Sequence, residues 1–216
     1  GSILDNRRSV RAFTNKPVAA ETLTKIFTLA QRAPSNCNTQ PWQVHVASGD
    51  TVEKLRKLLP AAMSEGKMSF DFPFEGKYSG LYKERQHDSA NVLYTALNIP
   101  REEKAERTKW FMKNYTFFDA PHVAFLFLPE QFGIREAADL GMYAQSLMLT
   151  LTAFGLASCP QTSLSFFANT IRDELDIDPS NKLLFGLSFG YEEKDDLANA
   201  GRVGRAPLEE TTIFHN

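Results

Sequence analysis

The sequence of 216 residues predicts an α+β protein made of amphipathic helices and short apolar strands. Helices are indicated by apolar residues at helical spacing, as in residues 21–33, where Leu23 and Ile26 share one face. Strands are indicated by apolar runs too short for a helix, such as residues 122–128 and 183–190. Hydrophobic residues form 43% of the chain, which supplies a core for one large domain or two small ones.

The individual elements follow in order along the chain. Helices are predicted at residues 21–33, 51–59, 81–97, 101–112, 136–154 and 166–175, and strands at residues 44–47, 122–128 and 183–190. The helix at residues 136–154 is apolar on nearly every side, which predicts burial in the core or in a dimer interface. Residues 34–42 and 156–163 combine short polar side chains with prolines, so they predict two ordered loops.

Residues 63–80 predict no regular element. Phe70, Phe74 and Tyr78 stand there among glycines and a proline, and aromatic side chains in such a segment favour a mobile flap or an interface. His122, by contrast, is predicted to be a structural residue at the end of a strand.

Composition excludes several classes of function. The net charge of -2 and a pI near 6.1 create no general attraction for nucleic acid, and no apolar run reaches the roughly 20 residues that span a bilayer. Cys37 and Cys159 have no metal-binding or CxxC spacing, and the histidines are scattered, so we expect neither a disulfide nor a metal. The expected compartment is the cytoplasm, with no nucleic acid and no membrane as partner.

An arginine-rich stretch near the N-terminus is the strongest candidate site. On an extended segment Arg7, Ser9 and Arg11 point to the same side and can converge on one ligand. Guanidinium groups suit phosphate, because they bind it with paired hydrogen bonds and keep their charge. A solvated basic segment is the alternative. Arg202 and Arg205 form a second cluster, and the chain has neither a P-loop nor a GxGxxG motif for a nucleotide.

The chain resembles the FMN-dependent nitroreductases over nearly its whole length, and most of all the nitrobenzoate and nitrophenol reductase branch. The resemblance rests on five motifs in order: Arg7-Arg8-Ser9-Val10-Arg11-Ala12-Phe13, Ala33-Pro34-Ser35 through Asn38 and Gln40-Pro41-Trp42, Phe118-Asp119-Ala120-Pro121, Gly155-Leu156 to Cys159-Pro160-Gln161, and Asn199 to Arg205. It implies a central, mostly antiparallel sheet flanked by helices, in a single FMN-binding domain spanning residues 1–216. Residues 63–115 would form a flap or excursion within that domain, and two copies would form an intertwined homodimer.

The resemblance also implies which residues hold FMN within one chain. Arg7, Ser9 and Arg205 would bind the phosphate and the ribityl chain, with Arg202 as a second phosphate contact. Arg8 would contribute mainly through its backbone. Arg11 would lie beside the N1 and O2 edge of the ring, where a fixed positive charge favours the reduced, negatively charged flavin.

The remaining implied site residues lie on the loops and the flap. The FMN of the partner subunit would be contacted by Pro34, Ser35, Asn36 and Asn38. The ring near N5 would be faced, largely through backbone groups, by Pro160, Gln161 and Thr162. The substrate would be covered by Tyr78, Tyr82 and Arg85. The resemblance implies no catalytic side chain, because the hydride moves directly to FMN N5.

The implied function is an oxidoreductase that passes electrons from NAD(P)H through FMN to a small-molecule acceptor, a nitroaromatic or a quinone, by a ping-pong mechanism. Two alternatives stay open. Relatives on the same fold destroy flavin, remove halogens or oxidise azolines, because a fold does not fix a reaction. A flavin-binding sensor or storage protein without turnover would need the same arginines but no open face above the ring.

Overall fold

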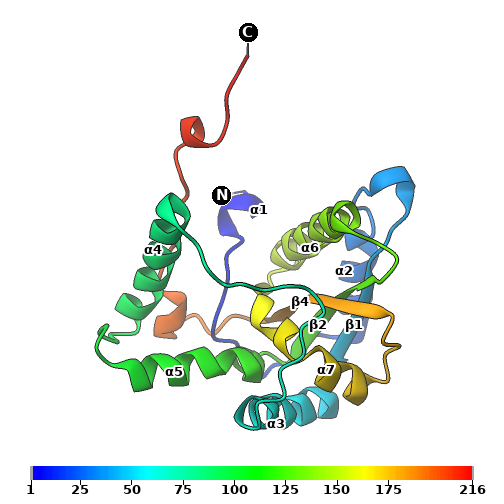
Figure 1. Ribbon diagram of the computed structural model, residues 1–216, viewed down its shortest axis with the longest axis horizontal. Coiled ribbons are helices and arrows are strands. Elements are labelled where there is room, and N and C mark those ends of the chain that lie inside the picture. Colours follow the sequence, from blue (N-terminus) through cyan, green and yellow to red (C-terminus); the bar gives the residue numbers. More distant parts are fainter. Residues whose placement is uncertain (1, 216) are drawn as a thin grey trace.

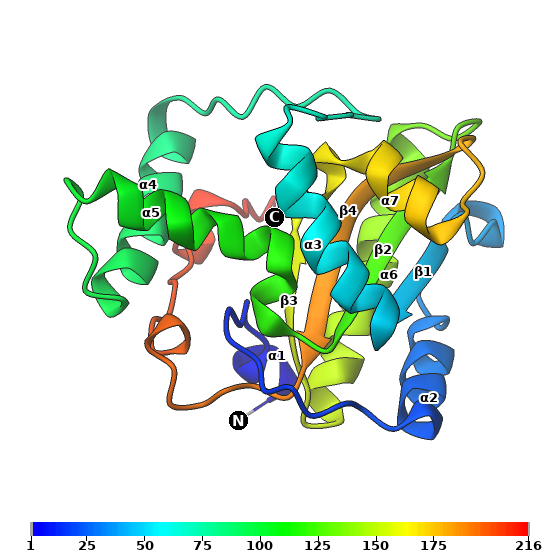
Figure 2. The same ribbon diagram turned by 90° about the horizontal axis from the view of Figure 1, so that it is seen from below.

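The computed structural model describes residues 2–215 and contains, within them, a four-stranded antiparallel sheet. The strands lie in the order β1, β2, β4, β3, with the bounds Gln43–Ser48 (β1), His122–Pro129 (β2), Asn181–Gly190 (β4) and Ala157–Gln161 (β3). Helices cover both faces of this sheet (Figures 1 and 2). The predicted α+β class, with a mostly antiparallel central sheet, is therefore confirmed.

The helices fall into three groups. Those against the sheet are α2 (Ala20–Ala30) and α6 (Ile134–Ala153) on one face, and α3 (Asp50–Ser64) and α7 (Ala168–Leu175) on the other. Those beside it are α1 (Ile3–Asn6), α4 (Gly80–Ala96) and α5 (Lys104–Met112). Short 3-10 turns join them, namely η1 (Asn36–Asn38), η2 (Lys113–Asp119), η3 (Thr162–Phe166), η4 (Leu197–Asn199) and η5 (Leu208–Glu210).

Strand β2 is the centre of the core. Successive side chains of a strand point to opposite faces, and here both faces are covered, so residues 122–128 are all buried. Val123, Phe125 and Phe127 belong to the cluster that α3 and α7 complete. Ala124 and Leu126 belong to the cluster under α2 and α6. Burial on both faces explains why this strand reads as one continuous apolar run.

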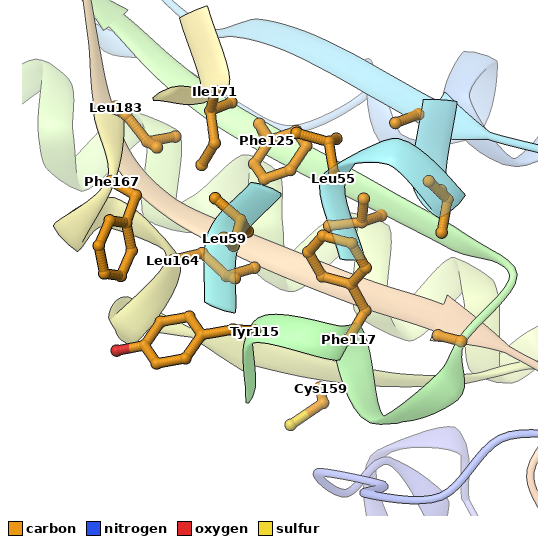
Figure 3. Close-up of a cluster of buried hydrophobic side chains, with 14 of the residues drawn as sticks. Leu55, Leu59, Tyr115, Phe117, Phe125, Cys159, Leu164, Phe167, Ile171 and Leu183 are labelled. Carbon is orange, nitrogen blue, oxygen red and sulfur yellow. The ribbon is translucent and has the colours of Figure 1, made fainter. Parts of the chain in front are cut away.

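The larger of the two core clusters contains more than half of the large side chains that are fully buried (Figure 3). Leu55 and Leu59 of α3 point toward Phe125, and Ile171 of α7 lies beside them (Figure 3). The ring of Phe117 meets that of Phe125 edge-on, with 6.3 Å between centroids. This cluster extends down to Cys159, so it reaches the strand β3 that borders the candidate site.

Strand β3 corrects one prediction. We expected residues 156–163 to form a polar loop, but Ala157–Gln161 pair with β4. Ser158 and Cys159 are buried there in spite of their small polar side chains. The pattern was missed because the strand is short and contains Pro160, which is tolerated only where no ladder hydrogen bond is needed, as on an edge strand.

Some helix boundaries also differ from the predicted ones. Helix α3 continues past Leu59 to Ser64 and includes Pro60. The segment predicted as one helix at residues 166–175 begins instead as the end of η3, and α7 starts at Ala168. The long helix α6 is not buried on all sides in this chain: Ile134 is 88% exposed and Met142 is 40% exposed.

The irregular segment between α3 and α4 is anchored at one end. Asp71 forms a two-pronged salt bridge with Arg172 of α7, including an Nη2–Oδ1 distance of 2.9 Å, and both side chains are almost completely buried. Asp71 also accepts a hydrogen bond from the amide of Leu183 at 2.7 Å. Beyond it, the ring of Phe74 packs on Phe166 with centroids 4.8 Å apart. The segment then leads into α4 and α5, which lie to one side of the sheet (Figures 1 and 2).

His122 is confirmed as a structural residue at a strand end. It is the first residue of β2 and only 3% exposed. Its Nε2 accepts a hydrogen bond from the amide of Val18 at 2.9 Å, so Nδ1 carries the proton and donates to Ser48 Oγ at 2.6 Å. Burial lowers the pKa of His122, because desolvation disfavours the charged imidazole.

This burial predicts a loss of stability in mild acid. The folded state holds His122 neutral, whereas the unfolded chain binds a proton near pH 6.5, so the stabilisation is complete above that pH and falls as the pH drops through it. Urea unfolding at pH 7.5 and pH 5.5 should show a smaller loss for His122→Gln than for the unchanged protein. His87→Gln, at an exposed position of α4, is the control and should behave like the unchanged protein. Equal pH dependence in His122→Gln would contradict this role.

Candidate active site

The N-terminal arginine segment extends the sheet. Ser9 forms a parallel bridge with Ser158 of β3, and the amide of Val10 donates to the Ser158 carbonyl at 3.0 Å. Further along, Phe13 pairs with Glu192, just beyond β4. Val10 is 1% exposed and anchors the segment in the core. These main-chain contacts place the arginines at one edge of the sheet, beside β3.

Arginines from both ends of the chain meet in one cavity of about 510 Å³. Its lining includes six of the residues singled out in the sequence: Arg7, Arg8, Ser9, Arg11, Arg202 and Arg205. Gln145 of α6 and Ser89 of α4 also line it. The predicted meeting of the two arginine clusters is therefore observed, although they are separated by almost the whole sequence.

The cavity is strongly positive. Among residues 2–215, Arg7, Arg11, Arg202 and Arg205 form no salt bridge, whereas Arg8 is paired with Glu192. Burial lowers the pKa of Arg8; the Glu192 carboxylate opposes this change, and the positive charge of Arg202 adds to it. Because the Arg8 side chain is occupied by Glu192, the unpaired arginines are the ones free to meet an anion.

The predicted ring-facing residues lie at the end of β3. Pro160 is half-buried and Thr162 is exposed. Gln161 is 4% exposed, and its side chain donates to the carbonyl of Asn114 at 2.9 Å, so it can offer a ligand only its main chain. Burial raises the pKa of the neighbouring Cys159 to about 11, with partial opposition from Arg11, which makes this thiol a poor nucleophile.

The loop predicted to reach a partner's cofactor does not line the arginine cavity of its own chain. Pro34, Asn36 and Asn38 are exposed, and both views show η1 well apart from α1 (Figures 1 and 2). Ser35 Oγ accepts a hydrogen bond from the Gln40 amide at 2.9 Å and shapes the loop. The loop is therefore ordered but separate from the arginines of the same chain.

The predicted substrate residues are only partly brought together. Arg85 lines a second cavity of about 670 Å³ between α4 and the C-terminal segment, next to Arg205, and forms a salt bridge with Glu210 at 2.7 Å. Tyr78 and Tyr82 are 56% and 68% exposed and do not line that cavity. Within one chain, these three residues do not form a closed site.

Two buried residues were missed in the sequence. Asp139 of α6 accepts a hydrogen bond from the amide of Asn36 at 3.1 Å and so holds η1 in place. Asn199 joins the N-terminal segment to the C-terminal one through its side chain. Asp139 is the only acid of α6 beyond the first turn, which holds Glu136, and this was an available signal. For Asn199 the sequence offered only its place at the start of the last motif.

Comparison with known proteins agrees with this geometry. The model of the nitroreductase family matches residues 4–191. The chain belongs to the nitroreductase family. As a nitroreductase it is 45% identical over 213 residues to nitroreductase NfnB of Mycolicibacterium smegmatis, covering 98% of this chain and 91% of that protein. It is 31% identical to a 4-nitrobenzoate reductase of Pseudomonas putida, covering 99% and 94%. The predicted relation to nitrobenzoate reductases is thus confirmed.

The fold of this chain also agrees with that of a solved nitroreductase. The solved structure of the FMN-dependent nitroreductase NfnB from Mycobacterium smegmatis in complex with NADPH superposes with a TM-score of 0.95 at 45% identity. The match covers 99% of this chain and 96% of that one. The predicted nitroreductase-like fold is therefore confirmed for the single chain.

Proposed function

We propose that this nitroreductase binds FMN in the arginine cavity and uses NADPH to reduce nitroaromatic or quinone-type acceptors. The observation that carries the proposal is the meeting of unpaired arginines from both ends of the chain in one cavity beside β3. The relative NfnB, an FMN-dependent enzyme in complex with NADPH, supports the choice of cofactor and donor. When bound, FMN supplies the chemistry, because its ring accepts a hydride and returns electrons to an acceptor.

The donor set fits FMN. Its phosphate needs charged and hydroxyl donors, and Arg7, Ser9 and Arg205 provide them, with Arg202 as a second phosphate contact. Arg8 contributes through its backbone, since its side chain is paired with Glu192. These residues would orient the cofactor and neutralise its phosphate.

Arg11 and β3 would frame the ring. Arg11 would place a fixed positive charge beside the N1 and O2 edge, and its position is set by a hydrogen bond from its amide to Asn199 Oδ1 at 2.8 Å. Pro160, Gln161 and Thr162 would present main-chain groups near N5. No acid or base side chain is required by this arrangement, because a hydride needs no proton transfer at N5.

A homodimer would complete the site. Pro34, Asn36 and Asn38 are exposed and Ser35 is half-buried. All four lie outside the arginine cavity of their own chain, so this loop would reach the FMN of the other copy. The exposed apolar side chains Ile134 and Met142 of α6, together with Ile213 and Phe214 of the C-terminal tail, would supply the interface. In Figure 1 this tail extends away from the rest of the chain.

The substrate would enter beside the excursion formed by residues 63–115 of a single domain. Tyr78, Tyr82 and Arg85 would contact it once the second copy encloses the pocket. Among the described residues, no helix is long and apolar enough to cross a membrane. The proposed setting is the cytoplasm, with neither nucleic acid nor membrane as partner.

The phosphate site gives the first prediction. Arg205→Ala should weaken FMN binding by roughly 1.5–3 kcal/mol, the usual worth of a hydrogen bond to a charged group. Equilibrium titration by flavin fluorescence measures this loss. Arg101→Ala, an exposed arginine between α4 and α5, is the control and should leave affinity unchanged. An unaltered FMN affinity in Arg205→Ala would sink the assignment.

The proposed dimer interface gives the second prediction. Met142→Glu should produce monomers that bind FMN poorly, because it places a charge within the proposed apolar interface. Leu58→Glu is the matched control, since Leu58 of α3 is 39% exposed and Met142 is 40% exposed. Analytical ultracentrifugation of both variants decides the matter; a stable, FMN-loaded monomer of the unchanged protein would refute the dimer.

The mechanism gives the third. We expect NADPH and the acceptor to use the same space above the ring in turn, because the chain offers no separate dinucleotide motif. Double-reciprocal plots of the steady-state rates should then be parallel, and each substrate should inhibit competitively against the other at high concentration. Intersecting lines would show that both substrates bind together and that the shared space is wrong.

A further inference from the structure

Asn199 is a polar side chain that is nearly completely buried beside the arginine cavity. It is 3% exposed and lies at the end of η4, outside the cavity lining. A buried amide is costly unless it is hydrogen-bonded, so its partners indicate what it does.

The side chain of Asn199 uses both of its N–H donors and its acceptor oxygen to join two segments. Its Oδ1 accepts from the amide of Arg11 at 2.8 Å. Its Nδ2 donates to the carbonyl of Ala12 at 2.9 Å and to the carbonyl of Glu193 at 2.8 Å. The partners lie in the arginine segment and in the chain just after β4, so one side-chain amide connects two segments that are far apart in sequence.

These partners require an amide. The main chain presents an N–H group to Oδ1 and two carbonyl oxygens to Nδ2. Only a side chain with one acceptor and two donors matches this pattern. An aspartate would set an oxygen against both carbonyls, and a hydrophobic residue would remove the acceptor that Asn199 offers to the Arg11 amide. The site is therefore chemically specific for asparagine.

Other contacts hold the chain on either side of Asn199, where the second arginine cluster begins. Asp196 caps η4 by accepting from the Ala198 amide at 2.8 Å, and Arg202 Nη1 donates to the Asn199 carbonyl at 3.4 Å. At Gly201 the chain passes so close to α4 that a Cβ there would lie 2.8 Å from Val92 Cγ1. Beyond Gly201 the chain has little freedom to shift toward α4.

We propose that Asn199 is a positioning residue for cofactor binding: through the main chain of Arg11 and Ala12 it sets the spacing between the N-terminal cluster, which carries Arg7 and Ser9, and the C-terminal cluster, which carries Arg202 and Arg205. This inference rests on the proposed FMN site. Arginine side chains are long and rotate freely, so a phosphate is bound tightly only if the two backbones that carry them are held at the right separation. Asn199 touches neither the phosphate nor the reacting atoms and acts through the arginines.

The alternative is that main-chain pairing alone holds the two ends. The amide of Thr14 donates to the Tyr191 carbonyl at 2.9 Å, and the amide of Glu193 donates to the Ala12 carbonyl at 3.0 Å. If these bonds suffice, removing the Asn199 side chain lowers the stability of the fold but does not weaken the binding of a phosphorylated flavin more than that of an unphosphorylated one.

The test compares FMN with riboflavin, which lacks the phosphate. Full-length protein loaded with either flavin is diluted, and release is followed by flavin fluorescence. Asn199→Ala should raise the dissociation constant for FMN about tenfold while changing that for riboflavin less than about twofold. In an Arg202→Ala/Arg205→Ala background, Asn199→Ala should cause no further loss of FMN affinity, because the C-terminal arginines whose spacing from the N-terminal cluster it sets are gone.

Controls separate positioning from stability. Val52→Ala removes core volume in α3, far in sequence from both arginine clusters of the cavity. It should lower the melting temperature without changing the ratio of FMN to riboflavin affinity. Asn199→Ser, a milder variant, gives the same comparison if Asn199→Ala folds poorly. An equal loss for both flavins, or no loss for either, would overturn the positioning role while FMN binding by the unchanged protein stands. An unchanged protein that binds FMN no better than riboflavin would overturn the phosphate site and this role together.

Discussion

The main-chain pairing of the N-terminal segment with the far end of the chain is the constraint on which the candidate site depends. Ser9 and Val10 pair with Ser158, and Phe13 pairs with Glu192, so residues next to the start of the chain become the neighbours of both β3 and β4. Hydrogen bonds of this kind are worth little individually, but each closes a very long loop, and the entropic cost of such a loop grows only slowly with its length. The arginines converge because the backbone brings them there.

The sheet supplies the rigidity that this pairing needs. Strand β2 is buried on both faces, and β4 lies between β2 and β3. Gly186 of β4 has Leu164 packed directly against it, where a Cβ would come within 2.4 Å of Leu164 Cδ1. The turn η3 is therefore pressed onto the sheet, which fixes the end of β3 near the proposed ring position. Packing in the core thus reaches the site through β3.

The sequence predicted the parts of this structure that depend on local pattern. Strand β2 was predicted from its apolar run, helix α2 from apolar spacing, helix α6 from apolar residues on nearly every side, and the arginine clusters from residue type. Strand β3 was missed because its pairing with β4, not its composition, makes it a strand. Asn199 and Asp139 were missed for a related reason: a single polar residue becomes significant only when distant backbone groups surround it. The roles of the predicted site residues stay proposals, since they depend on a cofactor and a second subunit.

The exposed apolar residues constrain how a second copy would bind. Fully burying a side chain such as Ile134 or Met142 contributes roughly 1.5–3 kcal/mol, so four of them in a symmetric pair contribute at most about 6–12 kcal/mol. Association itself costs about 4–15 kcal/mol in lost freedom of motion. Burial of Ile134 and Met142 alone would therefore only about offset the cost of association. A stable pair also needs the tail that carries Ile213 and Phe214, which are 77% and 73% exposed. Since the loop at Pro34 lies apart from its own arginines, assembly and cofactor binding would then be coupled: the contacts that would hold the two copies together are the ones that would bring this loop to the cofactor.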